Sequence, residues 1–588
     1  MKKALLPVLF LAMALVVSCA TSDPAEPTAP PSDPSVTQEM EGTVSPEATS
    51  PAAPEGTPSS TEAPVAPAEH DGLPLPTERG TFFAGSGACS SCHTNMVDES
   101  GADVSIDAAW RATMMANAAR DPYWQASVRV EGLLTPDYQA VIEDKCANCH
   151  MPMAHFTAMT EESSTLIFED GFLTPDNALH TMALDGVSCT LCHQIEEENF
   201  GELESFSGGF AIDDERPAGE RVAYGPYPVN EQQATVMSSV SGYVPVESPH
   251  IAQSELCATC HTLYTPYVDA SGEIAGEFPE QTPYLEWLNS DYVDSQACQD
   301  CHMPQADGAV QISTTGGPAR SPFFRHFFAG GNAYMLDVFR QFGGDMETRA
   351  SSADFTTKME RTAEQLRERT ATVTLEDAAI SGSELTAVVE VEILTGHKFP
   401  TGFPSRRAWL HLVVEDADGE VVFESGAVDA AGAIVGNAND EDPAAFEPHY
   451  LEITAADQVQ IYESIMEDTD GEVTTILLRA AGYAKDNRLL PVGFDPAAAD
   501  PDFAVYGAAT EDEDFAGGGD QVRYVIDLGD ASGPFNVTVE LLYQSISFRW
   551  VEKMRGYDVE EAQRFLSYVD QVPNQPVVVA SATVEGVE

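Results

Sequence analysis

The chain carries the sequence Cys-Thr-Leu-Cys-His at residues 189–193, in which two cysteines are separated by two residues and followed directly by a histidine. The same pattern occurs five times, at 89–93, 146–150, 189–193, 257–261 and 298–302. This is the attachment pattern of haem c. Two thiols add to the two vinyl groups of one haem, and the histidine that follows lies beneath the iron and supplies an axial nitrogen. The sequence therefore predicts five covalently bound haem c groups.

The predicted attachment residues fall into two sets. The predicted thioether cysteines are Cys89, Cys92, Cys146, Cys149, Cys189, Cys192, Cys257, Cys260, Cys298 and Cys301. The predicted proximal iron ligands are His93, His150, His193, His261 and His302.

Paired cysteines also occur in zinc sites, redox dithiols and disulfide frameworks. A zinc site does not require a histidine after every second cysteine, and a redox dithiol usually occurs once per domain. Eleven cysteines in an exported chain first suggest disulfides. Ten of the eleven, however, belong to the five motifs, and only Cys19 lies outside them. The spacing favours haem over the other three.

The first 19 residues read as an export signal. Lys2 and Lys3 precede an apolar run at 5–17, which is too short for a membrane-spanning helix. The run ends in Val-Val-Ser-Cys, which resembles a bacterial lipobox. The resemblance implies cleavage before Cys19 and lipidation of its thiol, and Ala20 after it implies the outer membrane. The alternative is an ordinary signal peptide with an incidental cysteine. We expect a cell-envelope protein, lipid-anchored at the periplasmic face or the cell surface.

Charge restricts the partners. Acidic residues outnumber basic ones 95 to 28, for a formal charge of −67, which excludes nucleic acid because phosphate binding needs a basic face. The membrane is expected to be reached only through the lipid. The acidity either serves solubility or steers a cationic partner, which salt would weaken. The expected partners are redox proteins or an extracellular acceptor, and the oligomeric state is left open.

A chain of 588 residues is too long for a single core, and the pattern predicts a multidomain α + β protein. Residues 20–77 are rich in Pro, Ala, Ser, Thr and Glu and read as a disordered tether. Residues 78–345 form a mostly helical and loop pentahaem domain, with helices at 106–119 and 333–342. A connecting helix capped by Asp354 lies within 346–370.

Residues 371–588 read as an all-β, sandwich-like domain. Alternation predicts strands at 386–394, 408–414 and 535–543. Asp418-Gly419 and Asp470-Gly471 lie between apolar runs and predict hairpin turns. These acidic turns lack the third acidic position and the distant Glu of an EF-hand loop, so hairpins are favoured over calcium sites.

The second axial ligand decides between electron transfer and substrate binding. Of the eight histidines outside the motifs, His70 falls in the tether and His411 in a strand. The candidate distal ligands are His155, His180, His250, His326 and His397, with His449 in reserve. With five distal histidines every iron is six-coordinate and no substrate site is open. Met151, Met153 and Met303 are alternative sulfur ligands that we expect to pack on porphyrin faces instead.

A family resemblance rests on histidines that precede an attachment motif. His180 lies nine residues before Cys189, and His250 seven before Cys257. This arrangement resembles the multihaem cytochromes of the cytochrome c-552/c-554 and hydroxylamine-oxidoreductase-like group. The resemblance spans about residues 80–345 and implies that such histidines ligate a neighbouring haem, which links the haems into a compact wire. The segment Gly-His-Lys-Phe-Pro-Thr-Gly at 396–402 is similar to one downstream of the haem region in some exported multihaem cytochromes.

The expected function is electron transfer through bis-His haems, as a carrier rather than an enzyme. One alternative is a multihaem reductase of nitrite, hydroxylamine or a sulfur oxyanion. Pentahaem nitrite reductases resemble the chain in haem number, but they use a Cys-x-x-Cys-Lys motif that is absent here. The other alternative is a subunit of an extracellular cytochrome filament.

Overall fold

In the computed structural model, residues 69–588 are described. The predicted signal peptide at 1–19, Cys19 and the predicted tether up to residue 68 lie outside the described residues. Within the last part of the predicted tether, Leu73 N–H donates to the carbonyl of Thr348 (2.8 Å), and Ser352 N–H donates to that of His70 (3.0 Å). The packed body therefore already includes residues that the sequence assigned to a tether ending at 77.

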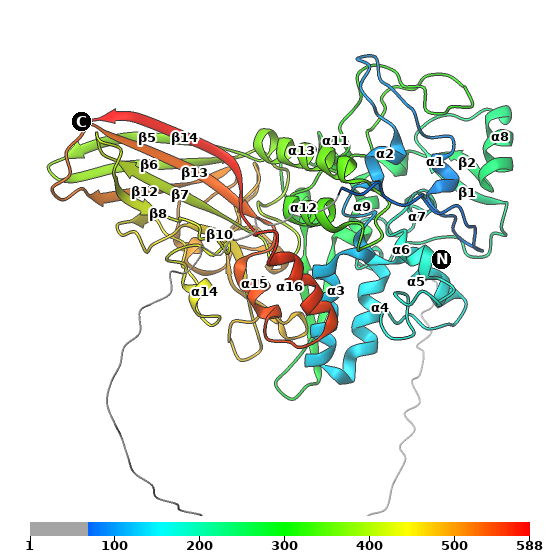
Figure 1. Ribbon diagram of the computed structural model, residues 1–588, viewed down its shortest axis with the longest axis horizontal. Coiled ribbons are helices and arrows are strands. Elements are labelled where there is room, and N and C mark those ends of the chain that lie inside the picture. The colour runs from blue at the N-terminus through cyan, green and yellow to red at the C-terminus, as the bar shows by residue number, and fades with distance from the viewer. Residues whose placement is uncertain (1–68) are drawn as a thin grey trace, which may run out of the picture. The chain divides into compact units, whose positions relative to one another are not determined.

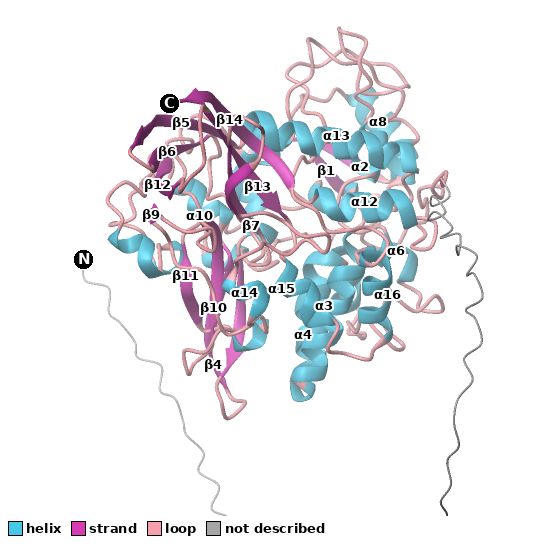
Figure 2. Ribbon diagram, turned by 60° about the vertical axis from the view of Figure 1, so that its left-hand side comes forward, coloured by secondary structure: helices cyan, strands magenta, loops and turns pink. Residues whose placement is uncertain are grey.

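Short helices and long loops build the first half of the described chain, as predicted (Figures 1 and 2). The helices are α1 (Gly87–Ser90), α2 (Ile106–Arg111), α3 (Pro122–Leu134), α4 (Gln139–His150), α5 (Pro152–Thr160), α6 (His180–Leu184), α7 (Cys189–Cys192), α8 (Glu231–Ser241), α9 (Ser254–His261), α10 (Pro283–Leu288), α11 (Cys298–His302), α12 (Ala333–Phe342) and α13 (Ser352–Arg369). Two small strand pairs accompany them, β1 (Arg221–Gly225) with β2 (Tyr243–Glu247) and β3 (Leu263–Val268) with β4 (Ile274–Gln281).

Local side-chain bonds explain where two predicted helices differ from the observed ones. The helix predicted at 106–119 stops after Arg111, where Asn117 Nδ2 donates to the carbonyls of Arg111 (3.0 Å) and Thr113 (2.9 Å) and competes with continued helix. The connecting helix is capped by Ser351 and not by Asp354. The Asp354 N–H donates to Ser351 Oγ (3.1 Å), and the Asp354 carboxylate accepts from Ser351 N–H (2.9 Å).

Strands dominate the second half. They are β5 (Ala371–Ser381), β6 (Glu384–Ile393), β7 (Arg407–Glu415), β8 (Val421–Ser425), β9 (Glu452–Ile453), β10 (Ile461–Glu467), β11 (Gly482–Asp486), β12 (Gly519–Asp527), β13 (Phe535–Gln544) and β14 (Val577–Val587), with helices α14 (Ala438–Glu441), α15 (Phe548–Met554) and α16 (Glu560–Val569) between them. One sheet has the order β11-β10-β7-β13-β14, with β8 also paired to β7, and the other has the order β5-β6-β12-β9.

The two sheets share one apolar core. Alternate residues of β6, β7 and β13, such as Val389, Leu412 and Val539, are fully buried in the same cluster. Because side chains alternate across a strand, this burial matches the period-two pattern read from the sequence. Gly419 and Gly471 both have a φ of 80°, as the predicted tight turns require.

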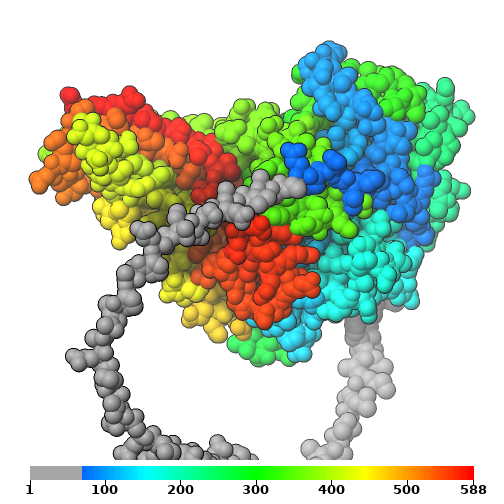
Figure 3. Space-filling model, viewed as in Figure 1, coloured from blue at the N-terminus to red at the C-terminus, as the bar shows by residue number. Residues whose placement is uncertain are grey.

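The core also crosses residue 370, the predicted end of the connecting helix. Tyr123, Phe339 and Phe355 of the first half pack in one cluster with Trp550 and Phe565 of α15 and α16. In the views, α15 and α16 lie beside α3, and their orange-red surface adjoins the cyan surface of α3 and α4 (Figures 1 and 3). The described residues fall within one compact α + β unit, Ala66–Glu588. Among them, no helix combines the length and apolar character needed to cross a bilayer.

Candidate haem-binding cavity

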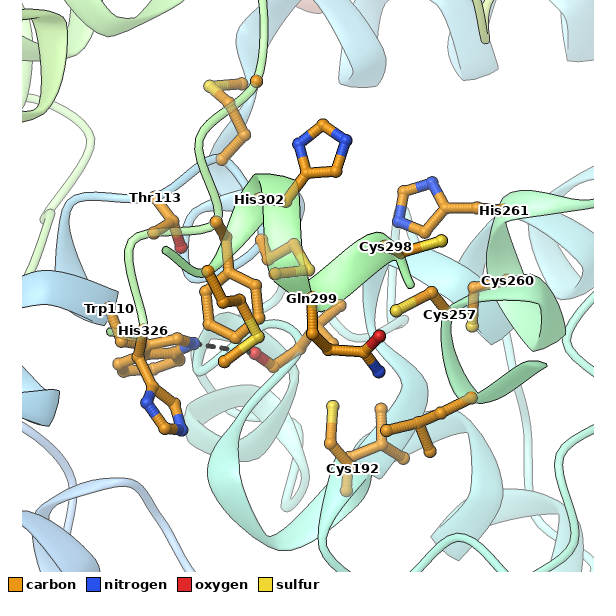
Figure 4. A pocket seen from close by; sticks show the side chains of 18 of the residues that line it. Trp110, Thr113, Cys192, Cys257, Cys260, His261, Cys298, Gln299, His302 and His326 are labelled. Carbon is orange, nitrogen blue, oxygen red and sulfur yellow. Dashed lines mark hydrogen bonds between the residues drawn. The ribbon is translucent and has the colours of Figure 1, made fainter. Parts of the chain in front are cut away.

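All five motifs open onto one cavity of about 1710 Å³. The side chains of all ten motif cysteines and all five motif histidines line it. None of these ten cysteines forms a disulfide. Figure 4 shows His261, His302 and His326 reaching the cavity from separate segments, with Cys192, Cys257, Cys260 and Cys298 around them. The residues predicted to hold five large flat groups therefore face a single interior space.

Helical backbone explains how each motif presents its three side chains together. The motifs lie on α1, the end of α4, α7, the end of α9, and α11. Residues three and four positions apart share one face of a helix, so the two cysteines and the following histidine point the same way. In the first motif, the His93 N–H donates to the carbonyl of Cys89 (3.1 Å), which continues the helical turn beyond α1.

Contacts between segments pack the motifs together. Ala84 N–H, just before the first motif, donates to Thr190 Oγ1 in the third (3.2 Å), and the neighbouring Cys189 thiol lowers the pKa of the Cys89 thiol. The fifth motif is tied to the segment before the fourth, since Cys298 N–H donates to Ser254 Oγ (3.1 Å).

The fourth motif also meets the second. The two lie close together, because the Cys149 thiol lowers the pKa of the Cys260 thiol. A loop between the two motifs bridges them, because Gly208 accepts from Asn148 Nδ2 (3.2 Å) and donates to the carbonyl of Thr259 (2.6 Å). The motifs thus form a close cluster, as a compact chain of haems requires.

Backbone carbonyls orient four of the motif imidazoles. The Nδ1 atoms donate as follows: His93 to Ile312 (2.7 Å), His150 to Ala118 (3.3 Å), His193 to Tyr224 (2.6 Å) and His302 to Ala329. A neutral imidazole that donates from Nδ1 keeps its Nε2 lone pair for a metal. Burial lowers the pKa of all five motif histidines, and takes those of His150 and His302 to about 4. The imidazoles are therefore neutral at pH 7, as metal ligands must be.

Two predicted distal histidines face motif histidines across the cavity. The rings of His193 and His326 lie 6.4 Å apart with an angle of 18° between their planes. Those of His302 and His397 lie 6.1 Å apart at 8°. Metal–imidazole bonds of about 2 Å place opposing nitrogens about 4 Å apart, and half a ring on each side gives about 6 Å between centres. Both pairs have the separation that one six-coordinate iron requires.

The two facing histidines, His326 and His397, each keep one ring nitrogen unoccupied. His326 Nδ1 donates to the carbonyl of Phe324 (3.2 Å), and His397 Nδ1 donates to that of Lys398 (2.8 Å), which leaves Nε2 free in each ring. Burial is the main cause that lowers the pKa of both, that of His326 to about 3.

The other three distal candidates do not line the cavity. His250 is buried with both nitrogens occupied, because Nε2 donates to the carbonyl of Ile195 (2.8 Å) and Nδ1 accepts from Ser248 Oγ (2.6 Å). His155 Nε2 donates to Asp144 Oδ1 (2.9 Å). His180 Nδ1 donates to the carbonyl of Phe172 (2.9 Å), which leaves its Nε2 free. The structure brings none of these three rings opposite a motif histidine at the separation of the two pairs.

The reserve candidate, His449, lies in a separate polar cluster between the sheets. Its Nδ1 accepts from Gln460 Nε2 (2.9 Å) and Asn487 Nδ2 (3.0 Å), and its Nε2 donates to Asp512 Oδ2 (3.0 Å). Both amides are held in this orientation, since their oxygens accept from the N–H groups of Tyr450 and Glu463. The proton therefore stays on Nε2, and His449 is not placed to bind iron.

The three methionine candidates differ in whether they line the cavity. Met303 lines the cavity. Met151 and Met153 are fully buried in apolar clusters outside it, where Met153 Sδ accepts from Thr190 Oγ1 (3.6 Å). These two methionines therefore pack against protein side chains and do not face the cavity, unlike the expected packing on porphyrin faces.

An aromatic ring and four basic side chains also line the cavity. The indole of Trp124 stacks on the His150 ring at 4.4 Å and 6°. Arg320, Lys358, Arg369 and Arg406 also line the cavity, in a chain with few basic residues. Lys358 Nζ donates to the carbonyls of Phe327 (2.5 Å) and Phe328 (2.9 Å), and burial lowers its pKa to about 7. No motif marks these residues, because they come from segments distant in sequence.

No family model matches the chain, and no curated protein matches it. Among solved structures, it is similar to a penta-heme cytochrome c552 from Thermochromatium tepidum, with 17% sequence identity and a TM-score of 0.48. The match covers 87% of this chain and 100% of that chain.

Proposed function

We propose that the chain is a multihaem c-type cytochrome that binds one haem c at each of its five motifs and passes electrons among them. One observation carries the proposal: the side chains of all ten motif cysteines and all five motif histidines converge on one cavity. A zinc or disulfide role does not account for a shared cavity of about 1710 Å³, whereas large flat cofactors do.

Each set of residues has a defined task in this proposal. The haem iron supplies the electron-carrying chemistry, with a potential set by axial ligands and surroundings. The cysteines hold each group covalently, and the neutral motif histidines supply the first axial nitrogen. Backbone carbonyls fix the ring orientation of four of these histidines. Arg320, Arg369 and Arg406 are suitable partners for haem propionates, because guanidinium groups pair with carboxylates.

The ligand pairs extend the proposal. His326 and His193 would hold one iron between them, and His397 and His302 would hold another. The ring separations of 6.4 and 6.1 Å support both assignments. Two strong protein ligands suit electron transfer rather than substrate binding.

One observation favours a second function, reduction of a small oxyanion or hydroxylamine. Within the described residues, His93, His150 and His261 have no imidazole facing them at the separation seen in the two pairs. An iron with one open side can bind substrate. Low-temperature EPR of the purified oxidised protein separates the two functions. A carrier gives low-spin signals that nitrite or hydroxylamine leaves unchanged, and a reductase gives a high-spin signal that shifts on their addition.

The location and partners are part of the proposal. The sequence pattern at 1–19 supports export and lipidation at Cys19, with the body held at the outer membrane on its periplasmic or outer side. The charge of −67 supports a cationic redox partner over an anionic one.

Removing one attachment site tests the proposal. We expect the double variant Cys298→Ala/Cys301→Ala, made in a host that matures cytochromes c, to carry one haem fewer than the parent by intact mass. The matched control is Ser90→Ala/Ser91→Ala, inside a motif but between its cysteines, which keeps the parental mass increment. Equal haem content in parent and double variant would contradict the assignment.

A further inference from the structure

Four charged side chains form a buried cluster beside the segment that carries His397. Lys398 Nζ lies 2.9 Å from Asp486 Oδ2, and Arg488 lies 2.7 Å from Asp486 and 2.9 Å from Glu286. Each of the four side chains is at most 7% exposed. Two positive and two negative groups thus neutralise one another out of contact with solvent.

The cluster bonds directly to the backbone around His397. Glu286 Oε2 accepts from Lys398 N–H (3.1 Å) and from Thr401 Oγ1 (2.5 Å). Lys398 Nζ also donates to the carbonyl of Ala504 (3.0 Å). The carbonyl of Lys398 accepts in turn from His397 Nδ1 (2.8 Å). The carbonyl of Lys398 therefore orients the ring of His397, and Glu286 holds both the Lys398 N–H and the Thr401 side chain.

Glu286 is also linked to the fifth motif, which carries His302. Glu286 lies on α10, twelve residues before Cys298 of the fifth motif. Trp287, the next residue, donates from Nε1 to the carbonyl of Gln296 (2.9 Å), just ahead of that motif. Asp486 and Arg488 come from the end of β11 in the sheet region. The cluster thus joins the His302 segment, the His397 segment and the larger sheet.

We infer that Glu286, Lys398, Asp486 and Arg488 form a positioning network that holds His397 opposite His302 and so keeps the iron of the fifth motif six-coordinate. The inference rests on the proposed function. Glu286 is its central positioning residue, because its carboxylate reaches Arg488, Lys398 and Thr401 together. A protein group that orients a metal ligand from outside the metal contact typically changes metal binding when it is removed.

A second buried pair in the sheet region offers a matched control. Lys485 Nζ lies 3.1 Å from Glu463 Oε1, with both side chains nearly buried. Lys485 also donates to the carbonyl of Ile461 (2.9 Å), so this pair ties β11 to β10 without bonding to the His397 segment. Glu463→Gln therefore makes the same chemical change in the same region while leaving the ligand segment intact.

The experiment compares full-length, haem-loaded parent, Glu286→Gln, Glu463→Gln and His397→Gly by intact mass and low-temperature EPR. We expect all four proteins to carry five haems. Glu286→Gln and His397→Gly lose the low-spin signal of one haem and gain one high-spin signal, and added imidazole restores the low-spin form. Glu463→Gln keeps the parental spectrum. If Glu286→Gln does not accumulate, Thr401→Val, which removes one bond to the same carboxylate, takes its place.

The outcomes separate this inference from the proposed function. A parent protein without haem mass contradicts the proposed function itself. A Glu286→Gln protein with five haems and the parental spin states contradicts only the positioning network. A spin-state change of equal size in Glu463→Gln also contradicts it, because the effect then follows from any buried charge lost in the sheet region.

Discussion

The helical half and the sheet half of the chain fill their interiors differently. The two sheets bury their own side chains against one another, and Leu410, Leu412 and Val539 are fully enclosed. The helical half carries every cysteine motif and lines most of a cavity of about 1710 Å³, which His397 and Arg406 of the sheet half also line. The sheet half therefore encodes a core filled by its own side chains, whereas the helical half combines smaller apolar clusters with a large cavity. This difference predicts that cofactor loss and core mutation affect the two halves unequally.

The largest effect is expected from withholding haem. Full-length protein made in a host without cytochrome c maturation should lose native packing in the helical half, because the side chains that line the cavity then have no haem to pack against. Limited proteolysis followed by mass spectrometry should show early cleavage within 78–345 and slower cleavage within the strands of 371–588. Haem-loaded protein is the control. Equal protease resistance of the two preparations in the helical half would contradict the comparison.

The next largest effect is expected from the sheet core. Leu412→Ala should lower the free energy of unfolding by about 2–5 kcal/mol, since it removes a fully buried side chain of β7 and leaves a cavity. Urea unfolding followed by circular dichroism measures the change, and haem content should stay at the parental value. Leu451→Ala, at a leucine 54% exposed in the same half, should change the free energy by less than about 0.5 kcal/mol. Similar losses in both variants would show that the sheets do not form the described core.

A pH effect is expected from the polar cluster between the sheets. Burial, with the charges of Asp512 and Asp514, raises the pKa of Asp520 to about 8, and Asp520 Oδ1 has no hydrogen-bond partner. Between about pH 4 and pH 8 the folded state therefore binds one more proton than the unfolded state. This contribution to stability is full below about pH 4 and is lost as the pH rises towards 8.

Asp520→Asn should remove that pH dependence. The slope lost is at most about 1.4 kcal/mol per pH unit, measured as unfolding free energy from pH 4 to 8. Asp527→Asn, at the exposed end of the same strand, should keep the parental slope. A parental slope in Asp520→Asn would show that this carboxyl does not bind a proton on folding.

The smallest effect is expected at a hairpin. Gly419 has a φ of 80°, so Gly419→Ala should cost about 1–2 kcal/mol of unfolding free energy through backbone strain. Gly482→Ala, in β11 of the same half, is the control, because an added Cβ there meets only ordinary van der Waals contacts with Glu467 and the backbone has no positive φ. Equal effects at the two sites would argue against the turn.

Local patterns in the sequence were sufficient for much of the fold. Alternation located β6, β7 and β13 to within about two residues, and apolar spacing located α12. The predictions were wrong where non-local contacts or side-chain hydrogen bonds determine the structure. Asn117 ends α2 through its amide, and the residues around Leu73 are held by Thr348, almost three hundred positions away. The apolar cluster that crosses residue 370 has no local signature either.

In the candidate site, too, the sequence identifies local patterns but not residues that only the fold brings together. Each attachment motif is five consecutive residues, so the sequence alone identifies it. A candidate distal ligand is recognised only by the ring that it faces, and His326 is 133 residues from His193. Position relative to a motif is not enough: His250 precedes Cys257 by seven residues, yet both of its nitrogens are occupied elsewhere. The network around Lys398 joins three distant segments and gives no sequence signal.

Intact mass spectrometry of the mature protein from a maturation-competent host tests the central claim most directly, when read with its visible absorption spectrum. The expected result is a mass excess over the polypeptide equal to five haem groups, with a Soret band. A mass equal to the polypeptide alone, with no Soret band, would contradict the account.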